Sequence, residues 1–216
     1  MTTDFNKNFL DENWWKTATP DDVMAEIKNG ADVNAKGTLR DARPLILAAK
    51  CHKNLQTIRM LIDNGADVNS KSYIDSTPLM FAQDIETVKI LIEHGADVNN
   101  KNYLEETPLK YAKSPEIAEF LIKHGADVNF TDGLGHTLLM CIRNPKVSEV
   151  LIKNGADVNA KDIAGYIALD YAKGLANRKL AKILKSYGSE DRRPFWCKIF
   201  PLIEKNKYFL DRSIPW

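Results

Sequence analysis

Apolar residues recur with helical spacing in short blocks along most of this chain. Val88, Leu91 and Ile92 show the pattern, because spacings of three and four place them on one face of a helix. An equivalent block stands at Ile58, Leu61 and Ile62, and an aliphatic run stands at Val150, Leu151 and Ile152. Each block is followed by a glycine, the residue that most readily takes the left-handed conformation that ends a helix. The pattern predicts a series of short amphipathic helices, each ending at a glycine.

The glycine after each block opens the same five-residue segment, Gly-Ala-Asp-Val-Asn. Its copies are spaced 35, 30, 30 and 30 residues apart, and a degenerate copy, Tyr187-Gly188-Ser189, follows 33 residues after the fifth. The five copies begin at Gly30, Gly65, Gly95, Gly125 and Gly155. Periods of 20–50 residues indicate an array of stacked repeats. We expect the glycine to turn the chain, the alanine to pack where space is small, and the aspartate and asparagine to bond local backbone.

A second landmark, Thr-Pro-Leu, stands between the glycines. It occurs at residues 77–79 and 107–109, with variants at 43–45, 137–139 and 167–169. We expect the threonine to cap the first free N–H groups of a helix and the proline to take its first position. A second helix should begin at Thr19-Pro20, Ser114-Pro115 and Asn144-Pro145. Each unit is therefore helix, turn, helix and extended excursion, and it needs stacked neighbours to bury its apolar faces.

Thr-Pro-Leu-x-x-Ala followed by Leu-Ile-x-x-Gly-Ala-Asp-Val-Asn resembles the ankyrin repeat, over roughly residues 9–189. The resemblance implies an all-α repeat solenoid of stacked helix-turn-helix units with β-hairpin fingers. An atypical N-terminal capping repeat is expected at residues 1–34 and a C-terminal extension that is not of the ankyrin type at residues 190–216. The expected repeats between them are 35–69, 70–99, 100–129, 130–159 and 160–189.

The chain departs from the usual 33-residue ankyrin repeat in two places. The intervals from the proline position to the next glycine are 21, 17, 17, 17 and 20 residues. We therefore expect a shorter first helix and inter-helix turn, with a shallower ridge, in the units ending at Gly95, Gly125 and Gly155. Repeats of this kind point to a bacterial source. In the first unit, Trp14 and Trp15 lie in the first predicted helix, and we expect one to be buried and the other partly exposed.

The composition shows an uneven distribution of charge along the chain and indicates the cellular compartment in which the protein works. Residues 170–216 contain eleven Lys/Arg and five Asp/Glu, whereas the whole chain has a formal net charge of +1. That near-neutral total gives no reason to expect nucleic-acid binding. Cys51, Cys141 and Cys197 form no disulfide framework, which fits a reducing compartment. The N-terminus has no secretory signal pattern, and no apolar run reaches the roughly 20 residues needed to span a bilayer. We expect a cytoplasmic monomer, or alternatively a protein secreted without such a signal.

The sequence offers little catalytic or metal-binding chemistry. His94 and His124 precede consecutive glycines, and stacked helices roughly 8–10 Å apart hold equivalent positions too far apart to share one metal ion. His136 lies on a predicted hairpin and is the one histidine that we consider for binding. Cys141 shares its register with Phe81, Tyr111 and Tyr171, which predicts a core residue. We expect no catalytic residue, cofactor or metal ion, and the protein is not predicted to be an enzyme.

The resemblance implies a protein partner on the concave face, bound by hairpin tips and by the exposed side of the first helices. These are positions 8, 9, 11 and 15 after each glycine; in the first, longer hairpin Leu39, Arg40 and Ala42 correspond approximately. The candidate partner-binding residues are Tyr73, Ile74, Ser76, Met80, Tyr103, Leu104, Glu106, Lys110, Leu134, His136, Met140, Ile163 and Tyr166.

Two tips combine a tyrosine, an aliphatic residue and an acid. Asp75 and Glu105 stand where the other tips keep Gly135 and Gly165. Tyrosine is a typical anchor of protein interfaces, so these tips either bind a partner or pack against one another along the row, or do both. The acids favour a basic or neutral partner surface.

The last 27 residues are rich in aromatic and basic side chains. They fold as a cap over the last repeat, dock on a partner or membrane surface, or remain disordered. Candidate contacts in this extension are Phe195, Trp196, Phe200 and Trp216. For the whole chain, the sequence predicts a protein–protein interaction module: an adaptor, an inhibitor or an antitoxin-like neutraliser. The alternative is a secreted effector that binds a host protein.

Overall fold

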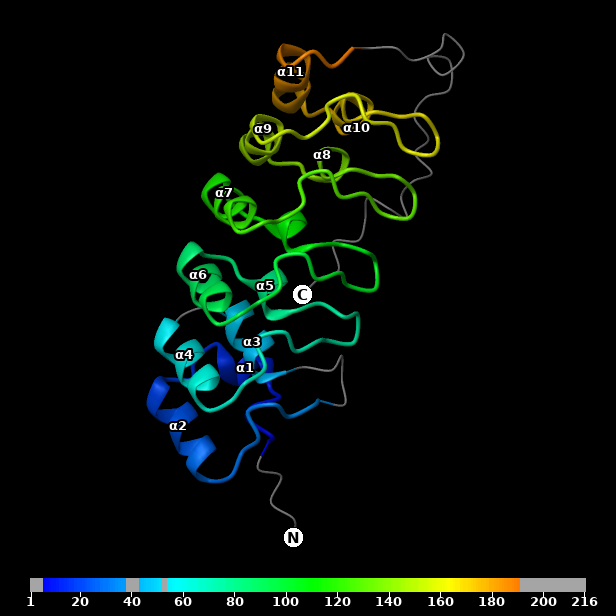
Figure 1. The fold of residues 1–216 in the computed structure, drawn as a ribbon. Coiled ribbons are helices and arrows are strands. Elements are labelled where there is room, and N and C mark those ends of the chain that lie inside the picture. Colours follow the sequence, from blue (N-terminus) through cyan, green and yellow to red (C-terminus); the bar gives the residue numbers. More distant parts are fainter. Residues whose placement is uncertain (1–5, 38–42, 52–53, 191–216) are drawn as a thin grey trace.

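Helix pairs stack into an elongated solenoid in the structure, a computed structural model that describes residues 6–37, 43–51 and 54–190 (Figure 1). The described residues contain eleven α-helices and one 3-10 helix, arranged as two layers with hairpins leaving one side. The first-helix layer contains α1 (Glu12–Trp15), α3 (Pro44–Cys51), α5 (Pro78–Phe81), η1 (Pro108–Tyr111), α8 (Leu138–Cys141) and α10 (Ala168–Gly174). The second-helix layer contains α2 (Pro20–Lys28), α4 (Leu55–Asp63), α6 (Ile85–Glu93), α7 (Pro115–Lys123), α9 (Pro145–Lys153) and α11 (Arg178–Ser186).

The second helices all have nine residues, and the three whose starts were predicted, α2, α7 and α9, begin at Pro20, Pro115 and Pro145 as expected. Ser114 Oγ accepts a hydrogen bond from the Ile117 N–H at 3.3 Å, and Thr19 forms a capping box with Asp22. These bonds satisfy N–H groups that the first turn of a helix leaves unpaired. The apolar side of each second helix faces the first-helix layer and forms the core, with Leu61, Leu91 and Leu121 fully buried.

The first helices confirm the expected shortening. Those of the three 30-residue units, α5, η1 and α8, have only four residues each, whereas α3 has eight and α10 has seven. The threonine cap was wrongly predicted: the hydroxyls of Thr77 and Thr107 are buried and make no hydrogen bond. Their backbone carbonyl groups accept instead, from the N–H groups of Met80 and Lys110, both at 3.0 Å.

The repeated Gly-Ala-Asp-Val-Asn segments connect the repeats to one another. Their glycines have φ between 88° and 95°, which confirms the helix-ending role, and their alanines are buried. Each aspartate bonds local backbone as expected; Asp97 Oδ1, for example, accepts from the Asn99 N–H. The asparagines were expected to do the same. They bond the next repeat instead, because their side chains reach the following glycine carbonyl, as Asn99 reaches Gly125 at 2.8 Å.

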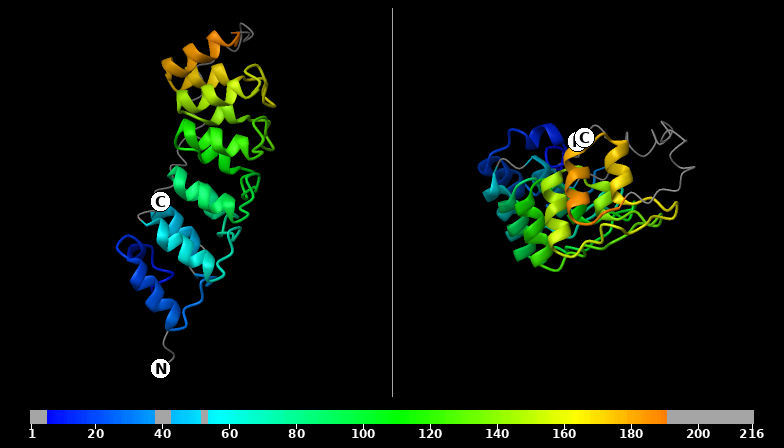
Figure 2. Two further views of the ribbon diagram at one scale, coloured as in Figure 1. Left: turned by 60° about the vertical axis from the view of Figure 1, so that its left-hand side comes forward. Right: turned by 90° about the horizontal axis from the view of Figure 1, so that it is seen from above.

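The expected β-hairpin fingers are present as tight turns that project from the same side of the stack (Figure 2). Among the described residues, the hairpins contain no regular strand, and their one isolated β-bridge pairs Thr131 with Thr137. The residue seven positions after each glycine holds the turn. Asp132 Oδ1 accepts from the N–H groups of Leu134 and His136, and Asn102 Oδ1 accepts from those of Leu104 and Glu106. Sequence reasoning missed this role, although Ser, Asn, Asp and Asp at that position are typical turn residues.

An aromatic cluster closes the N-terminal end of the stack. Trp15 is 5% exposed and its indole N–H donates to the Phe9 carbonyl at 2.9 Å, whereas Trp14 is only partly buried. One buried and one partly exposed tryptophan were expected. Several residues named from sequence lie outside the described ranges: Leu39, Arg40, Ala42, Cys197 and the four extension contacts Phe195, Trp196, Phe200 and Trp216.

Candidate functional site

The finger tips carry most of the exposed large apolar side chains of the described residues. Tyr73 is 76% exposed, Tyr103 80% and Ile163 77%, while Leu134 is 39% exposed. Beyond the fingers, only Leu55 and Tyr187 join this group among the described residues. Ile74 and Leu104, the neighbours of the two tyrosines, are half-buried. Most monomeric surfaces scatter such residues singly, so a row of them on successive hairpins is an unusual feature of this surface.

The tips touch one another through backbone and not through their exposed side chains. The Tyr103 N–H donates to the Ile74 carbonyl at 2.8 Å, and the Ile163 N–H donates to the Leu134 carbonyl at 3.1 Å. These bonds join the fingers in two pairs. They fix the spacing of the tips while the rings of Tyr73 and Tyr103 stay in solvent. Mutual packing therefore does not account for the tyrosines.

Two tips hold an acid in a backbone conformation that favours glycine. Asp75 has φ 59° and Glu105 has φ 58°, where the equivalent Gly135 and Gly165 have φ 76° and 81°. The left-handed region costs a residue with a side chain about 1–2 kcal/mol, somewhat less for aspartate. Both acids are exposed. Each of these two tips therefore presents a carboxylate two residues beyond the exposed tyrosine, at the cost of a strained backbone.

The predicted contacts at positions 11 and 15 need correction. Ser76, Met80 and Met140 are buried, with exposed fractions of 2%, 3% and 5%. Burial at this position does not depend on the short first helix, since Asp170, the equivalent residue in the longer α10, is 3% exposed. In the last four repeats, the residue at position 16 after the glycine is half-exposed, as was predicted for the residue at position 15. Cys141, expected in the core, is therefore half-buried at this position, as are Phe81, Tyr111 and Tyr171.

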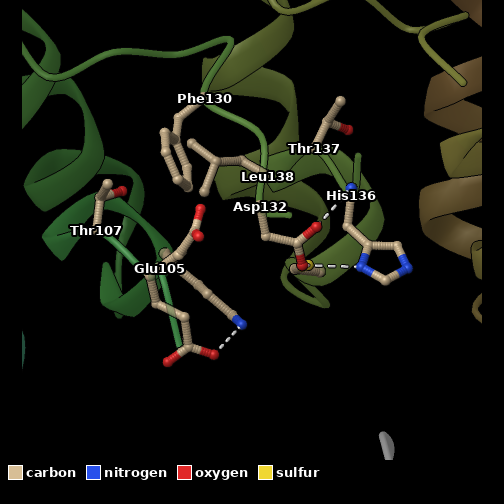
Figure 3. Close-up of a pocket in the computed structure, with 10 residues that line it drawn as sticks. Glu105, Thr107, Phe130, Asp132, His136, Thr137 and Leu138 are labelled. Atoms are coloured by element: carbon tan, nitrogen blue, oxygen red, sulfur yellow. Dashed lines mark hydrogen bonds and ion pairs between the residues drawn. The ribbon is translucent and has the colours of Figure 1, made fainter. Parts of the chain in front are cut away.

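The four other candidates at these positions, Glu106, Lys110, His136 and Tyr166, are half-buried at the finger bases. His136 links two repeats there: its Nδ1 lies 2.8 Å from Asp132 Oδ2, and its Nε2 lies 3.9 Å from Asp162 Oδ2 in the next finger. Figure 3 shows His136 and Asp132 pointing toward one another beside Phe130 and Leu138. The Tyr171 hydroxyl donates to the Asp162 carboxylate at 2.6 Å. His136 is thus part of the joint between fingers.

A second polar cluster surrounds Glu106. Its carboxylate accepts hydrogen bonds from the Lys110 ammonium, the Tyr111 hydroxyl and the Asn102 amide. Burial alone would raise the pKa of Glu106, but these three bonds outweigh burial and hold that pKa below its ordinary value. Burial and the bond to the carboxylate raise the pKa of the Tyr111 hydroxyl. Charge at this finger base is therefore compensated locally.

The same balance governs the His136 cluster. Burial would raise the pKa of Asp132, but bonds from the His136 side chain and from the His136 and Leu134 N–H groups lower it. The pKa of the Tyr171 hydroxyl is raised, first by burial and then by its bond to Asp162. The His136 cluster reaches Asp162 in the next finger, and the Glu106 cluster reaches the preceding finger through the Asn102 amide, 3.4 Å from Ser76 Oγ. Both clusters therefore connect neighbouring fingers at their bases.

His94 and His124 have structural roles. His94 Nδ1 lies 2.7 Å from the Ile90 carbonyl oxygen and His124 Nδ1 lies 2.8 Å from that of Phe120, so each ring donates to the carbonyl four residues earlier. Asn64 and Asn154 do the same with their amides. Within the described residues, no three His, Cys, Asp or Glu side chains are grouped to hold a metal ion. No helix described there is long and apolar enough to cross a membrane.

Comparison with known proteins identifies the repeat. A family model described as ankyrin repeats, in three copies, matches residues 19–102, 45–132 and 109–193. The mouse ankyrin repeat and SOCS box protein 6 is 33% identical over 85 residues, which cover 36% of this chain and 20% of that protein. The human protein of the same name is 34% identical, with the same coverage. The matched part is thus a fifth of the length of these curated relatives.

Proposed function

This chain belongs to the ankyrin repeat family, and from that premise we propose that it binds a protein partner through the row of finger tips. The exposed tyrosines Tyr73 and Tyr103 are the observation that carries the proposal. Tyrosine gives a large contact area at a small cost in side-chain entropy and is enriched in the energetic centres of interfaces. The protein acts by occupying or recruiting its partner, as an adaptor, an inhibitor or a neutraliser.

The chemistry of the tips sets the kind of partner surface. The fingers of residues 70–76 and 100–106 present a tyrosine and a carboxylate each, whereas those around Leu134 and Ile163 present aliphatic side chains. A complementary partner offers basic groups to the first pair and an apolar patch to the second. The hydrogen-bonded clusters at the finger bases keep the tips in register, so little ordering is needed on binding.

The test compares capture of partners by three tagged proteins. These are the wild type, the Tyr73→Ala/Tyr103→Ala double variant and a Tyr187→Ala control, which removes a 39%-exposed tyrosine at the end of α11. Circular dichroism confirms that all three are folded, and mass spectrometry identifies what each retains. We expect the control to bind like the wild type. Loss of two anchor tyrosines should weaken binding at least about 30-fold, from about 2 kcal/mol or more for one anchor.

A partner held equally by the double variant and the wild type would contradict binding through these tips. The same three baits are then exposed to extracts of the source organism and of a candidate host cell. A partner present only in the host extract favours a delivered effector, and one present in the source organism favours an adaptor or neutraliser. In either case, the dependence on Tyr73 and Tyr103 is what tests the surface.

A further inference from the structure

The chain ends in a segment whose composition has no counterpart in the repeats. Residues 191–216 contain six Lys/Arg against three Asp/Glu. They also contain Phe195, Trp196, Phe200 and Trp216. Segments that remain solvated as coil are poor in aromatic residues, so this composition calls for an apolar surface to pack on. Its excess of positive charge calls for carboxylates on that surface.

At the near end of the stack, apolar surface is limited to the 39%-exposed Tyr187 and to partly buried side chains such as Ile183, and α11 itself carries no acid. Helix α11 buries Leu180 and Leu184 in the core of the stack. Its outward surface exposes four cations, Arg178, Lys179, Lys182 and Lys185. A basic aromatic segment folded over this end would meet like charge and little apolar area. The cap predicted from sequence is therefore disfavoured by the surface on which it would rest.

The finger row offers both properties together. Tyr73 and Tyr103 supply exposed aromatic rings, and Asp75 and Glu105 supply exposed carboxylates. The lysine of the second of these fingers, Lys101, has its ammonium 4.5 Å from the centre of the Phe130 ring, so it is directed toward the next unit. We propose that residues 191–216 dock in cis along the finger row, placing their basic and aromatic side chains on the tips around Tyr73 and Tyr103.

The length of the segment permits this path. Twenty-six residues follow Glu190, and an extended chain covers about 3.3–3.6 Å per residue, or about 90 Å. Successive repeats are roughly 10 Å apart, so the finger of Tyr73 lies about 30 Å along the stack from that of Ile163. The segment can therefore leave the last repeat, reach the fingers of residues 70–76 and 100–106 and still cross both tips.

Docking in cis would make the extension a built-in competitor. It would occupy the same tips that are proposed to hold the partner, at the high effective concentration of a tethered ligand. A partner would then have to displace it. A separate ligand that is basic and aromatic, like the extension, would bind best to a chain from which the extension has been removed.

Zero-length carbodiimide crosslinking of the full chain tests the proposal, because it joins a carboxylate only to a lysine in direct contact. Isotope-labelled and unlabelled chains are mixed before reaction, so that mass spectrometry separates crosslinks within a chain from those between chains. We expect crosslinks within a chain between Asp75 or Glu105 and Lys198, Lys205 or Lys207. Their loss is expected in the full-length Asp75→Asn/Glu105→Gln variant. They should persist in a Glu93→Gln/Glu119→Gln control, which removes two exposed acids from the second-helix layer.

Hydrogen exchange of the finger amides gives a second readout on the same full-length proteins. Trp196→Ala/Phe200→Ala should accelerate exchange in residues 72–76 and 102–106 if the extension covers them. Crosslinks of the extension lysines only to Glu149 of the penultimate repeat, or only between labelled and unlabelled chains, would overturn docking in cis. Absence of finger crosslinks together with unchanged exchange would overturn it as well. None of these outcomes depends on the partner protein. Docking in cis can therefore be refuted or supported independently of partner binding by the finger tips.

Discussion

The side chain of Asn99 donates a hydrogen bond to the Gly125 carbonyl in the next repeat, with Nδ2 2.8 Å from the oxygen. The same amide accepts from the Asp127 N–H at 2.9 Å. The asparagines that repeat this pair of bonds are Asn34, Asn69, Asn129 and Asn159. The last residue of each repeated segment is therefore a link between units, and this explains why the segment recurs nearly unchanged.

Replacing Asn99 with alanine should lower the free energy of unfolding by about 1–2 kcal/mol, because two hydrogen bonds between repeats are lost at a solvent-exposed edge. Urea denaturation followed by circular dichroism measures the change. The control is Glu93→Gln, an exposed substitution in the adjoining helix α6, which should stay within about 0.5 kcal/mol of the wild type. Equal stability of the Asn99→Ala and control proteins would mean that water replaces the amide at no cost.

Local chemistry explains what could be predicted from the sequence. The caps at Ser114 and Asn144 and the helix ends at Gly95 and Gly125 follow from residues within four positions of each boundary, and all are confirmed. The partners of Asn99 lie 26 and 28 residues further along the chain, so nothing in its own segment indicates them. The sequence shows that the asparagine recurs, whereas only the stack shows what it bonds.

The same distinction explains the errors at the candidate surface. The tips of Tyr73 and Tyr103 were correctly placed in solvent, because hairpin turns project from the stack whatever the packing behind them. Met80 and Met140 were not, because the direction of a side chain on a one-turn helix depends on how the neighbouring units dock against it. Thr77 has the right residue type for a cap, but tertiary packing buries its hydroxyl away from the N–H groups.

Gly135 should tolerate alanine far less well than Gly165. Both have positive φ, 76° and 81°, so alanine strains the backbone at either position. At Gly135, a Cβ would also lie 3.2 Å from Asp162 Cα and 3.3 Å from the Ile163 backbone nitrogen, whereas at Gly165 it would meet nothing within 4 Å. We expect Gly165→Ala to cost about 1 kcal/mol and Gly135→Ala about 2–3 kcal/mol.

Thermal unfolding of the two alanine variants measures the difference under identical conditions. The comparison is internally controlled, since the substitution and the sign of φ are the same and only the close approach of the next finger differs. Equal losses would show that the fingers separate easily, which would contradict the rigid, paired row inferred from the Ile163–Leu134 backbone bond.

Glu105→Gly should stabilise the protein, although it removes a surface carboxylate. Glycine removes the strain of φ 58°, but the greater freedom of the unfolded chain offsets about half of that stabilisation. The free energy of unfolding should therefore rise by about 0.5–1 kcal/mol. Asp75→Gly should gain less, because aspartate tolerates this conformation better. Glu105→Ala is the control: it removes the carboxylate and keeps the strain, so it should not stabilise. A gain in both Glu105 variants would assign the effect to charge instead of backbone.

Lowering the pH should remove the contribution that the Glu106 carboxylate makes to the free energy of unfolding. The folded carboxyl group has a pKa below its ordinary 4.5, because bonds from Lys110, Tyr111 and Asn102 outweigh the effect of burial. In the unfolded chain it takes up a proton near pH 4.5, but in the folded chain only at lower pH. Its contribution is therefore fully present above pH 4.5 and is lost as the pH falls through the folded pKa.

The Glu106→Gln variant isolates this effect. At pH 7 it should be less stable than the wild type, and the difference in unfolding free energy between the two should shrink steadily from pH 5 to pH 3. Urea denaturation at each pH measures that difference, and Glu93→Gln shows how much any single acid contributes. A Glu106→Gln difference that stays constant down to pH 3 would show that the bonds from Lys110 and Tyr111 do not favour the charged form, and that packing alone holds this finger base.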